Sequence, residues 1–233
     1  MESKNPEHIA IVLDGNRRYA MKKGLKPWKG HEFGMKKLEN LLSWCEELGI
    51  KELTLYAFSL DNFKRPEIEK KVLFGLFKEG IKNLEGDNRL SKLGIRIRFL
   101  GRLSLFPKEV QEEMHKIMEK TKNYDNFKIN LCMAYSGKSE ITDALKKIIE
   151  KIKNNEIKEE DVDEKLVERN LYLNGKPDIL IRPGGEKRLS DFLIWQSAYS
   201  ELFFLDKLWP EFEKGDLIEV IEEFKQRERR FGE

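Results

Sequence analysis

The chain has few of the residues that mark metal centres or disulfide frameworks, and it has no long apolar run. Its two cysteines, Cys45 and Cys132, lie far apart in apolar surroundings, and its three histidines are scattered, so a zinc site is not expected. No apolar run approaches the about 20 residues of a membrane-spanning helix, and no signal-peptide pattern precedes the first apolar run. We therefore expect a soluble, cytoplasmic protein with buried, reduced thiols.

An excess of charge of one sign is also missing. With 44 basic and 42 acidic side chains, the formal net charge is +2. This balance excludes a nucleic-acid scaffold, because such proteins need a clear basic surplus. No internal repeat and no linker rich in proline, glycine or serine interrupts the 233 residues, of which 39% are apolar. The sequence therefore predicts one domain, residues 1–233.

Short apolar runs alternate with longer amphipathic stretches, which predict strands and helices respectively. Strands are expected at residues 8–13, 52–58, 95–100, 127–133, 179–181 and 201–205, and helices at 35–48, 67–84, 109–122, 140–153 and 217–229. The charge-rich stretch 154–168 is expected to be a connection. This order predicts an α/β fold with a central, mainly parallel sheet flanked by helices. Four polar residues directly follow strands and are expected to converge at the carboxyl edge of the sheet: Asp14, Ser59, Tyr135 and Arg182.

The segment after the fifth strand combines the groups that bind diphosphate. Arg182, Glu186, Arg188 and Ser190 flank two glycines. Arginine binds phosphate through two parallel hydrogen bonds, and glycine lets the backbone approach an anion closely. The carboxylate either pairs with an arginine or holds a cation that bridges phosphates. The segment therefore predicts a diphosphate site.

The turn after the first strand predicts a second anion site. The segment Asp14-Gly-Asn-Arg-Arg18 opens a helix whose N–H groups and dipole favour an anion, and Asp14 could hold Mg²⁺ that bridges a diphosphate. The plainer alternative is an N-capping aspartate with solvated arginines. His31 is either a phosphate donor or a structural residue. A third cluster, which either contacts a ligand or completes a turn, consists of Ser59, Asn62 and Arg65.

Together these motifs resemble those of the cis-prenyltransferases, and the chain is similar to enzymes of the undecaprenyl-diphosphate-synthase type. The motif blocks are Asp-Gly-Asn-x-Arg from Asp14, Gly-His-x-x-Gly from Gly30, Thr-Leu-Tyr-Ala-Phe-Ser from Thr54, and Arg-x-Gly-Gly-Glu-x-Arg-x-Ser from Arg182, followed by Trp195-Gln and Glu201. Arg17 and Tyr19 replace the glycine and tryptophan usual in bacterial members, which indicates an archaeal-type branch.

The resemblance implies a homodimer that requires Mg²⁺ and holds the growing chain in an apolar tunnel. The implied reaction adds isopentenyl diphosphate repeatedly to farnesyl or geranylgeranyl diphosphate, with a new cis double bond each time. The product is a long-chain polycis-polyprenyl diphosphate, the precursor of a lipid glycosyl carrier. It is delivered to a membrane, with which a protein lacking a transmembrane segment can associate peripherally. Product length and primer choice stay open.

The resemblance also implies roles for single residues. Asp14 would place Mg²⁺ on the allylic diphosphate, and Glu201 would complete the metal environment. Asn62 has the position usually given the proton-acceptor role, but an amide is a poor base, so a substrate diphosphate oxygen or Asp14 is the alternative. Glu186 would orient the neighbouring arginines. The allylic diphosphate would be surrounded by Gly15, Asn16, Arg17, Arg18 and His31, and that of isopentenyl diphosphate by Arg182, Arg188 and Ser190. Further substrate contacts are implied for Tyr19, Ser59, Leu60, Asp61, Phe63, Arg65 and Leu189, and for Arg230 and Gly232 of a tail that reaches the partner subunit's site.

Other interpretations fit less well. A non-catalytic partner subunit of a heteromeric prenyltransferase would lose catalytic residues, whereas Asp14, Asn62 and Glu201 are all present. A trans-prenyltransferase would contain an Asp-Asp-x-x-Asp motif, which is missing here. A generic phosphotransfer protein would have a phosphate-binding P-loop, but Cys132 stands where the loop ending in Ser136-Gly-Lys-Ser139 requires glycine.

Overall fold

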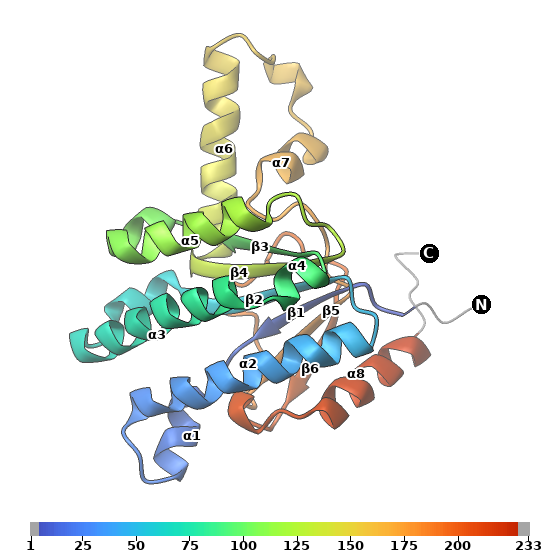
Figure 1. Ribbon diagram of the computed structural model, residues 1–233. Helices are drawn as coiled ribbons and strands as arrows, with labels where there is room; N and C mark the ends of the chain where they lie inside the picture. The colour runs from blue at the N-terminus through green and yellow to red at the C-terminus, as the bar shows by residue number, and fades with distance from the viewer. Residues whose placement is uncertain (1–4, 228–233) are drawn as a thin grey trace.

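An all-parallel sheet of six strands forms the centre of the protein in a computed structural model that describes residues 5–227 (Figure 1). The strands are β1 His8–Val12, β2 Glu52–Ser59, β3 Ile95–Leu100, β4 Phe127–Tyr135, β5 Ile179–Pro183 and β6 Glu201–Leu205, in the order β3-β4-β2-β1-β5-β6. Every predicted strand is present, and each pairing is parallel. The predicted α/β fold is therefore confirmed.

Helices flank this sheet at α1 Asn16–Lys22, α2 Gly30–Glu47, α3 Glu67–Gly86, α4 Arg89–Lys92, α5 Lys108–Thr121, α6 Gly137–Lys153, α7 Glu164–Asn170 and α8 Lys214–Gln226. α8 ends at Gln226, before the predicted end at residue 229. The stretch 154–168, predicted as a connection, contains most of α7. The Asp163 side chain caps this helix by accepting a hydrogen bond from the Leu166 N–H at 2.7 Å.

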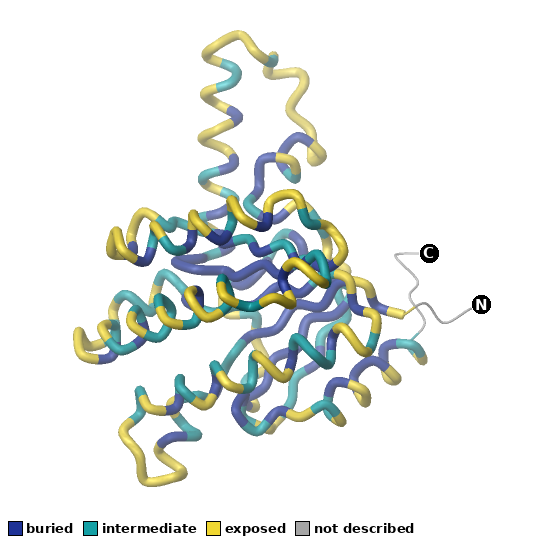
Figure 2. Tube along the Cα trace, in the orientation of Figure 1, coloured by how far each residue is buried: buried dark blue, intermediate teal, exposed yellow. Residues whose placement is uncertain are grey.

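The two faces of the sheet are covered differently because alternate strand residues point to opposite sides. Ile9 and Ile11 of β1 belong to the large core beneath α2, α3, α5 and α8. Ala10 and Val12 belong to a second core that includes Phe192. Figure 2 shows that the strands are mostly buried, whereas much of the projecting α6–α7 pair is exposed. Within residues 5–227, no helix is both long and apolar enough to cross a bilayer.

The strand order places a crevice at the carboxyl end of β1. β2, β4 and β3 lie in that spatial order on one side of β1, and β5 and β6 lie on the other side. Ligands in open parallel sheets bind where the order reverses in this way. Asp14 follows β1, Ser59 ends β2 and Arg182 lies near the end of β5. Three residues predicted from the sequence thus lie around this crevice.

Candidate active site

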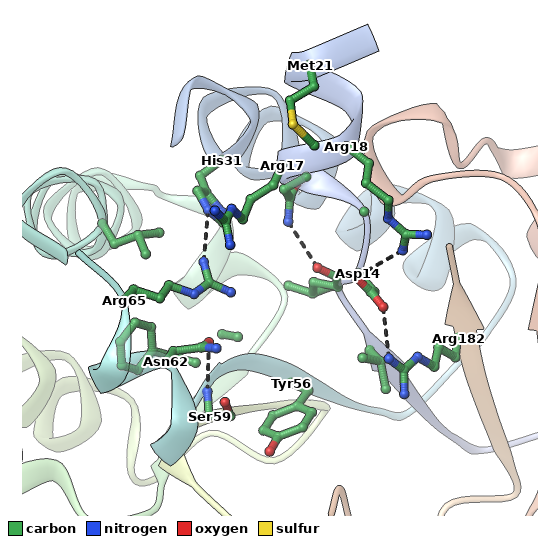
Figure 3. A pocket seen from close by; sticks show the side chains of 17 residues that line it. Asp14, Arg17, Arg18, Met21, His31, Tyr56, Ser59, Asn62, Arg65 and Arg182 are labelled. Carbon is green, nitrogen blue, oxygen red and sulfur yellow. Dashed lines mark hydrogen bonds and ion pairs between the residues drawn. The ribbon is translucent and has the colours of Figure 1, made fainter. Parts of the chain in front are cut away.

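A cavity of about 530 Å³ opens at this crevice. Figure 3 shows Asp14 between Arg182 and Arg18 on one side and the group of Arg17, His31 and Arg65 on the other. The lining residues that the sequence predicted are Asp14, Gly15, Asn16, Arg17, Arg18, His31, Ser59, Asn62, Arg65 and Arg182. The candidate active site is therefore a cationic cavity assembled from α1, α2, β2 and β5 around one aspartate.

Both carboxylate oxygens of Asp14 face arginines. Oδ2 accepts a hydrogen bond from Nη2 of Arg182 at 2.9 Å, and Oδ1 lies 3.3 Å from Nη2 of Arg18. Arg182 is only 4% exposed, and a buried guanidinium needs an anion or several acceptors to offset its lost hydration. In this arrangement Asp14 offsets the charge of two arginines that line the cavity.

The segment after β5 supplies the other partners of Arg182. Its Nη1 donates to the Ser190 hydroxyl at 2.7 Å and to the Arg188 carbonyl, while its Nε is buried without a partner among the described residues. Gly184 has a φ of 102°, and a Cβ there would stand 2.6 Å from Nη2 of Arg18. Glycine is therefore favoured here mainly by its left-handed backbone, because the Arg18 side-chain end could move aside.

Three residues in the loop that follows have left-handed backbone conformations unusual for side chains with a Cβ. The φ angles of Ser190, Asp191 and Leu193 are 49°, 65° and 46°. Asp191 fixes the loop: its carboxylate accepts hydrogen bonds from the Ser136 hydroxyl and from the Lys138 N–H at 3.0 Å. The start of α6 thus holds Ser190 against Arg182.

On the opposite wall, one oxygen of a buried carboxylate gathers three basic side chains. Oε1 of Glu69, a residue 2% exposed, accepts from Arg65 at 2.9 Å and lies 3.5 Å from Nε2 of His31 and 3.7 Å from Nε of Arg17. Burial, reinforced by the charge of Arg65, lowers the pKa of His31 from 6.5 to about 4. The ring is therefore neutral at pH 7, and its Nε2 accepts from Arg65 at 3.2 Å.

Asn62 is held by the turn that follows β2. Its Oδ1 accepts the Ser59 N–H at 3.1 Å, which leaves its amide N–H groups as donors toward the cavity that it lines. The Asn62 amide oxygen is thus already used as an acceptor in the free protein.

The polar cavity continues into an apolar passage between α2, α3 and the sheet. Both are lined by Leu13, Asn16, His31, Ala57 and Leu73. The passage measures about 80 Å³ and leads to a groove of about 470 Å³ that shares six further lining residues with it: Met35, Leu38, Leu76, Gly80, Leu84 and Leu131. A cavity of about 150 Å³ holds one benzene ring, so the passage must widen to admit a prenyl chain.

Several predicted contact residues lie outside the cavity wall. Tyr19 packs edge-on against Phe33 at 5.2 Å, and Phe63 packs on Phe58 at 5.0 Å. The Glu186 carboxylate pairs with Arg188 and lies 4.0 Å from Arg18. The remaining predicted residues pack beside the cavity or face solvent: Leu60, Asp61, Arg188, Leu189 and Ser190. Arg230 and Gly232 lie outside the described residues.

Within one chain, Glu201 is not brought to Asp14. It begins β6 opposite Ile179, at the amino end of the sheet, whereas Asp14 follows the carboxyl end of β1. The Glu201 carboxylate pairs with Arg227 at 2.7 Å. Parallel pairing therefore separates the two carboxylates that were expected to share a metal.

The sequence interpretation missed Glu69 and Met21. Met21 lies one helical turn after Arg17 and lines the cavity with it, a spacing that could have been recognised. Glu69 lies in the first turn of α3, where acidic residues are common for dipole reasons. Only the packing of α2 against α3 shows that it faces the site.

Comparison with known proteins gives a consistent family assignment. Residues 12–232 match the family model described as "Putative undecaprenyl diphosphate synthase". The chain is 48% identical, over 97% of its length and 87% of the relative's, to the tritrans,polycis-undecaprenyl-diphosphate synthase (geranylgeranyl-diphosphate specific) of Thermococcus kodakarensis. Two crystal structures are also similar. Lavandulyl diphosphate synthase from Lavandula x intermedia, in complex with dimethylallyl diphosphate, has a TM-score of 0.94 at 31% identity over 98% of this chain and 99% of that chain. A probable undecaprenyl diphosphate synthase from Campylobacter jejuni has a TM-score of 0.82 at 33% identity over 99% and 100%.

Proposed function

The chain belongs to the undecaprenyl diphosphate synthase family of cis-prenyltransferases, and from this premise we propose that it adds isopentenyl diphosphate repeatedly to geranylgeranyl diphosphate. The product would be a long-chain polycis-polyprenyl diphosphate. The observation that best supports this proposal is the sharing of Asp14 between two groups of anion-binding side chains at the mouth of an apolar passage. We propose geranylgeranyl diphosphate rather than farnesyl diphosphate as the primer, because the archaeal relatives are named as specific for it.

The allylic diphosphate is assigned to the wall formed by Arg17, Arg18, His31 and Arg65, next to the entrance of the passage. Ionisation of the allylic C–O bond leaves negative charge on the diphosphate, and preorganised guanidinium groups stabilise that charge. Phe58, Ala57 and Leu73 provide an apolar neighbourhood for the carbocation. The prenyl tail would enter the passage, where burial favours its advance by about 0.8 kcal/mol for each CH₂ group.

The diphosphate of isopentenyl diphosphate is assigned to Arg182, Arg188 and Ser190. As the allylic C–O bond breaks, the isopentenyl double bond attacks the allylic carbon, and a proton then leaves the isopentenyl C2 atom. Asn62 is a poor acceptor for this proton because its oxygen already accepts the Ser59 N–H. Asp14 is occupied by two arginines. We therefore assign the proton to an oxygen of the departing diphosphate.

Asp14 fits Mg²⁺, which proteins usually hold through one or two carboxylates while substrate phosphates and water complete its octahedron. Among residues 5–227 no group of three acidic, histidine or cysteine side chains is arranged to hold a metal alone, so the diphosphate would supply most ligands. When bound, the ion would neutralise charge on the leaving diphosphate.

We also propose the homodimer that the family resemblance implies. The outer face of α6 supports it, because Leu145 and Ile149 are 45% and 49% exposed one helical turn apart. Light scattering should give the mass of a dimer for the wild type and of a monomer for Leu145→Glu/Ile149→Glu. A tail that reaches the partner subunit's site remains a proposal for residues 228–233, outside the described part.

The catalytic proposal is tested with radiolabelled isopentenyl diphosphate, Mg²⁺ and separate C10, C15 and C20 primers. Chromatography should show long polymers, made best from the C20 primer. Asp14→Asn should lower turnover by at least about 100-fold, the usual cost of one essential electrostatic group, with an unchanged fold. Asp125→Asn, at an exposed carboxylate paired with Lys128, is the matched control. Absence of polymer with every primer would defeat the proposal.

A further inference from the structure

The segment from α1 to the start of α2, residues 16–31, concentrates positive charge, and we call it the α1–α2 turn. Residues 16–31 contain six arginines and lysines and no acidic residue, which exceeds the net charge of +2 for the whole chain. Arg17 and Arg18 line the cavity, whereas the four lysines of the turn are exposed. Lys22 and Lys29 pair with Glu211 and Glu32. Two lysines instead lie over aromatic rings: Lys23 over Tyr19 at 5.2 Å and Lys26 over Trp28 at 5.4 Å.

Apolar side chains are exposed on the same turn. Residues 21–26 are all exposed, and Met21 and Leu25 are 54% and 41% accessible. Phe33, at the start of α2, is 36% accessible and contacts Tyr19. The turn projects from the body at the end opposite to α6 and α7 (Figure 1), and Figure 2 shows its exposed tip. Nothing within the described chain covers these side chains.

We propose that this turn docks the protein on an anionic lipid surface. Lysines attract such a surface, and adjacent Leu, Met and aromatic side chains enter the boundary between headgroups and acyl chains while the lysine ends stay in water. A nucleic acid fits less well, because stacking of bases would require free ring faces and lysines already lie over Tyr19 and Trp28. The occupant is therefore a membrane rather than a polynucleotide.

Docking of this turn would serve release of the product, and this part of the proposal rests on the proposed function. Met21 belongs both to the exposed turn and to the wall of the diphosphate cavity. Docking would bring the cavity mouth to the headgroup layer, where the diphosphate of a long-chain product belongs. The chain of that product cannot remain in water, so release directly into a bilayer avoids a large cost in apolar exposure.

The experiment is flotation of the purified full chain with vesicles of phosphatidylcholine alone and with phosphatidylglycerol added. The wild type should float only with anionic vesicles. Each lysine near an anionic surface contributes about fivefold to binding, so Lys23→Gln/Lys26→Gln should lower the partition coefficient about 25-fold. Leu25→Ser should lower it roughly tenfold. Added salt should weaken binding of Leu25→Ser further, and should weaken binding of the lysine variant less than that of the wild type because fewer charges remain.

The matched control is Lys158→Gln/Lys165→Gln, which removes two exposed charges near α7 and should bind as the wild type does. Equal flotation with neutral and anionic vesicles, or unchanged binding by the turn variants, would overturn the proposal, as would binding of an oligonucleotide in place of vesicles. Polymer formation is measured separately with soluble substrates. A failure of docking is thereby distinguished from a failure of the proposed reaction.

Discussion

Replacing Glu69 with Gln should lower the stability of the free protein. The same change should increase the stabilisation that added diphosphate provides. The buried Glu69 carboxylate is the shared counter-charge of Arg65 and Arg17, since His31 is neutral at pH 7. Glutamine keeps the shape and one oxygen acceptor but removes the charge. The two guanidinium groups would then lack an anion in the free protein, and a bound diphosphate could provide one.

The size of the effect follows from the contacts. The Arg17 side chain is 50% exposed, so its part in the pair is screened and contributes under about 1 kcal/mol. The 2.9 Å hydrogen bond from Arg65 is charge-assisted and less exposed, a class of interaction that contributes about 1.5–3 kcal/mol. We expect a loss of about 2 kcal/mol, which lowers Tm by about 4–8 °C in a domain of this size.

Differential scanning fluorimetry with and without inorganic diphosphate would measure both effects. The Tm of Glu69→Gln should be lower than that of the wild type, and its increase on adding diphosphate should be larger. Glu67→Gln, in the same helical turn but 89% exposed and paired with Lys70, should match the wild type in both. An equal or smaller ligand-induced increase in Glu69→Gln would refute the assignment of this wall to diphosphate.

Three other predictions test the passage, the buried histidine and the second substrate site. Gly80→Leu should shorten the polyprenyl products seen by thin-layer chromatography, because a Cβ there would already stand 2.7 Å from Met35 Cε, whereas Gly75→Leu, where nothing lies within 4 Å of that Cβ, should not. Since the pKa of His31 is about 4 in the folded protein, against 6.5 for an unperturbed histidine, its neutral form stabilises the fold fully above pH 6.5. The free energy of unfolding should fall as the pH drops from 6.5 to 4, by about 2 kcal/mol at pH 5. Urea unfolding should show this loss for the wild type. The same fall of unfolding free energy with pH in His31→Gln would contradict the prediction. Ser190→Ala removes one hydroxyl acceptor from Arg182 and should raise KM for isopentenyl diphosphate about fivefold, with KM for the primer unchanged. Steady-state kinetics with each substrate varied in turn measures both constants. A raised KM for the primer alone would contradict the prediction.

The fold could be predicted from the sequence because local patterns determine where the strands lie. The run from His8 into Asp14 is apolar and ends in a turn, and β1 occupies residues 8–12 of it. α7 was missed because its stabilisation is tertiary: Leu166 and Val167, set among charged residues, are buried against Ala144 and Ile148 of α6. Hydrophobic periodicity cannot detect a helix with so short an apolar face.

The site could be predicted only as far as motif order allowed. Motifs placed Asp14 and Arg182 together, and the hydrogen bond between them is present. Motifs cannot give strand register, however, and register is what puts Glu201 at the other end of the sheet. The role of Glu69 was also invisible, because its contact with His31 joins α2 to α3 across 38 positions of sequence.

The left-handed loop that holds Ser190 has a consequence for how the two substrates are recognised. Each such residue costs about 1–2 kcal/mol relative to an ordinary backbone conformation, and the hydrogen bonds from Ser136 and Lys138 to Asp191 help to offset that cost. Those two residues belong to the start of α6, outside the cavity wall. In the proposed assignment, recognition of isopentenyl diphosphate would therefore depend on the start of α6, which lies outside the cavity wall, whereas recognition of the primer would not. A substitution at Ser136 could therefore change the KM for isopentenyl diphosphate and leave the KM for the primer unchanged.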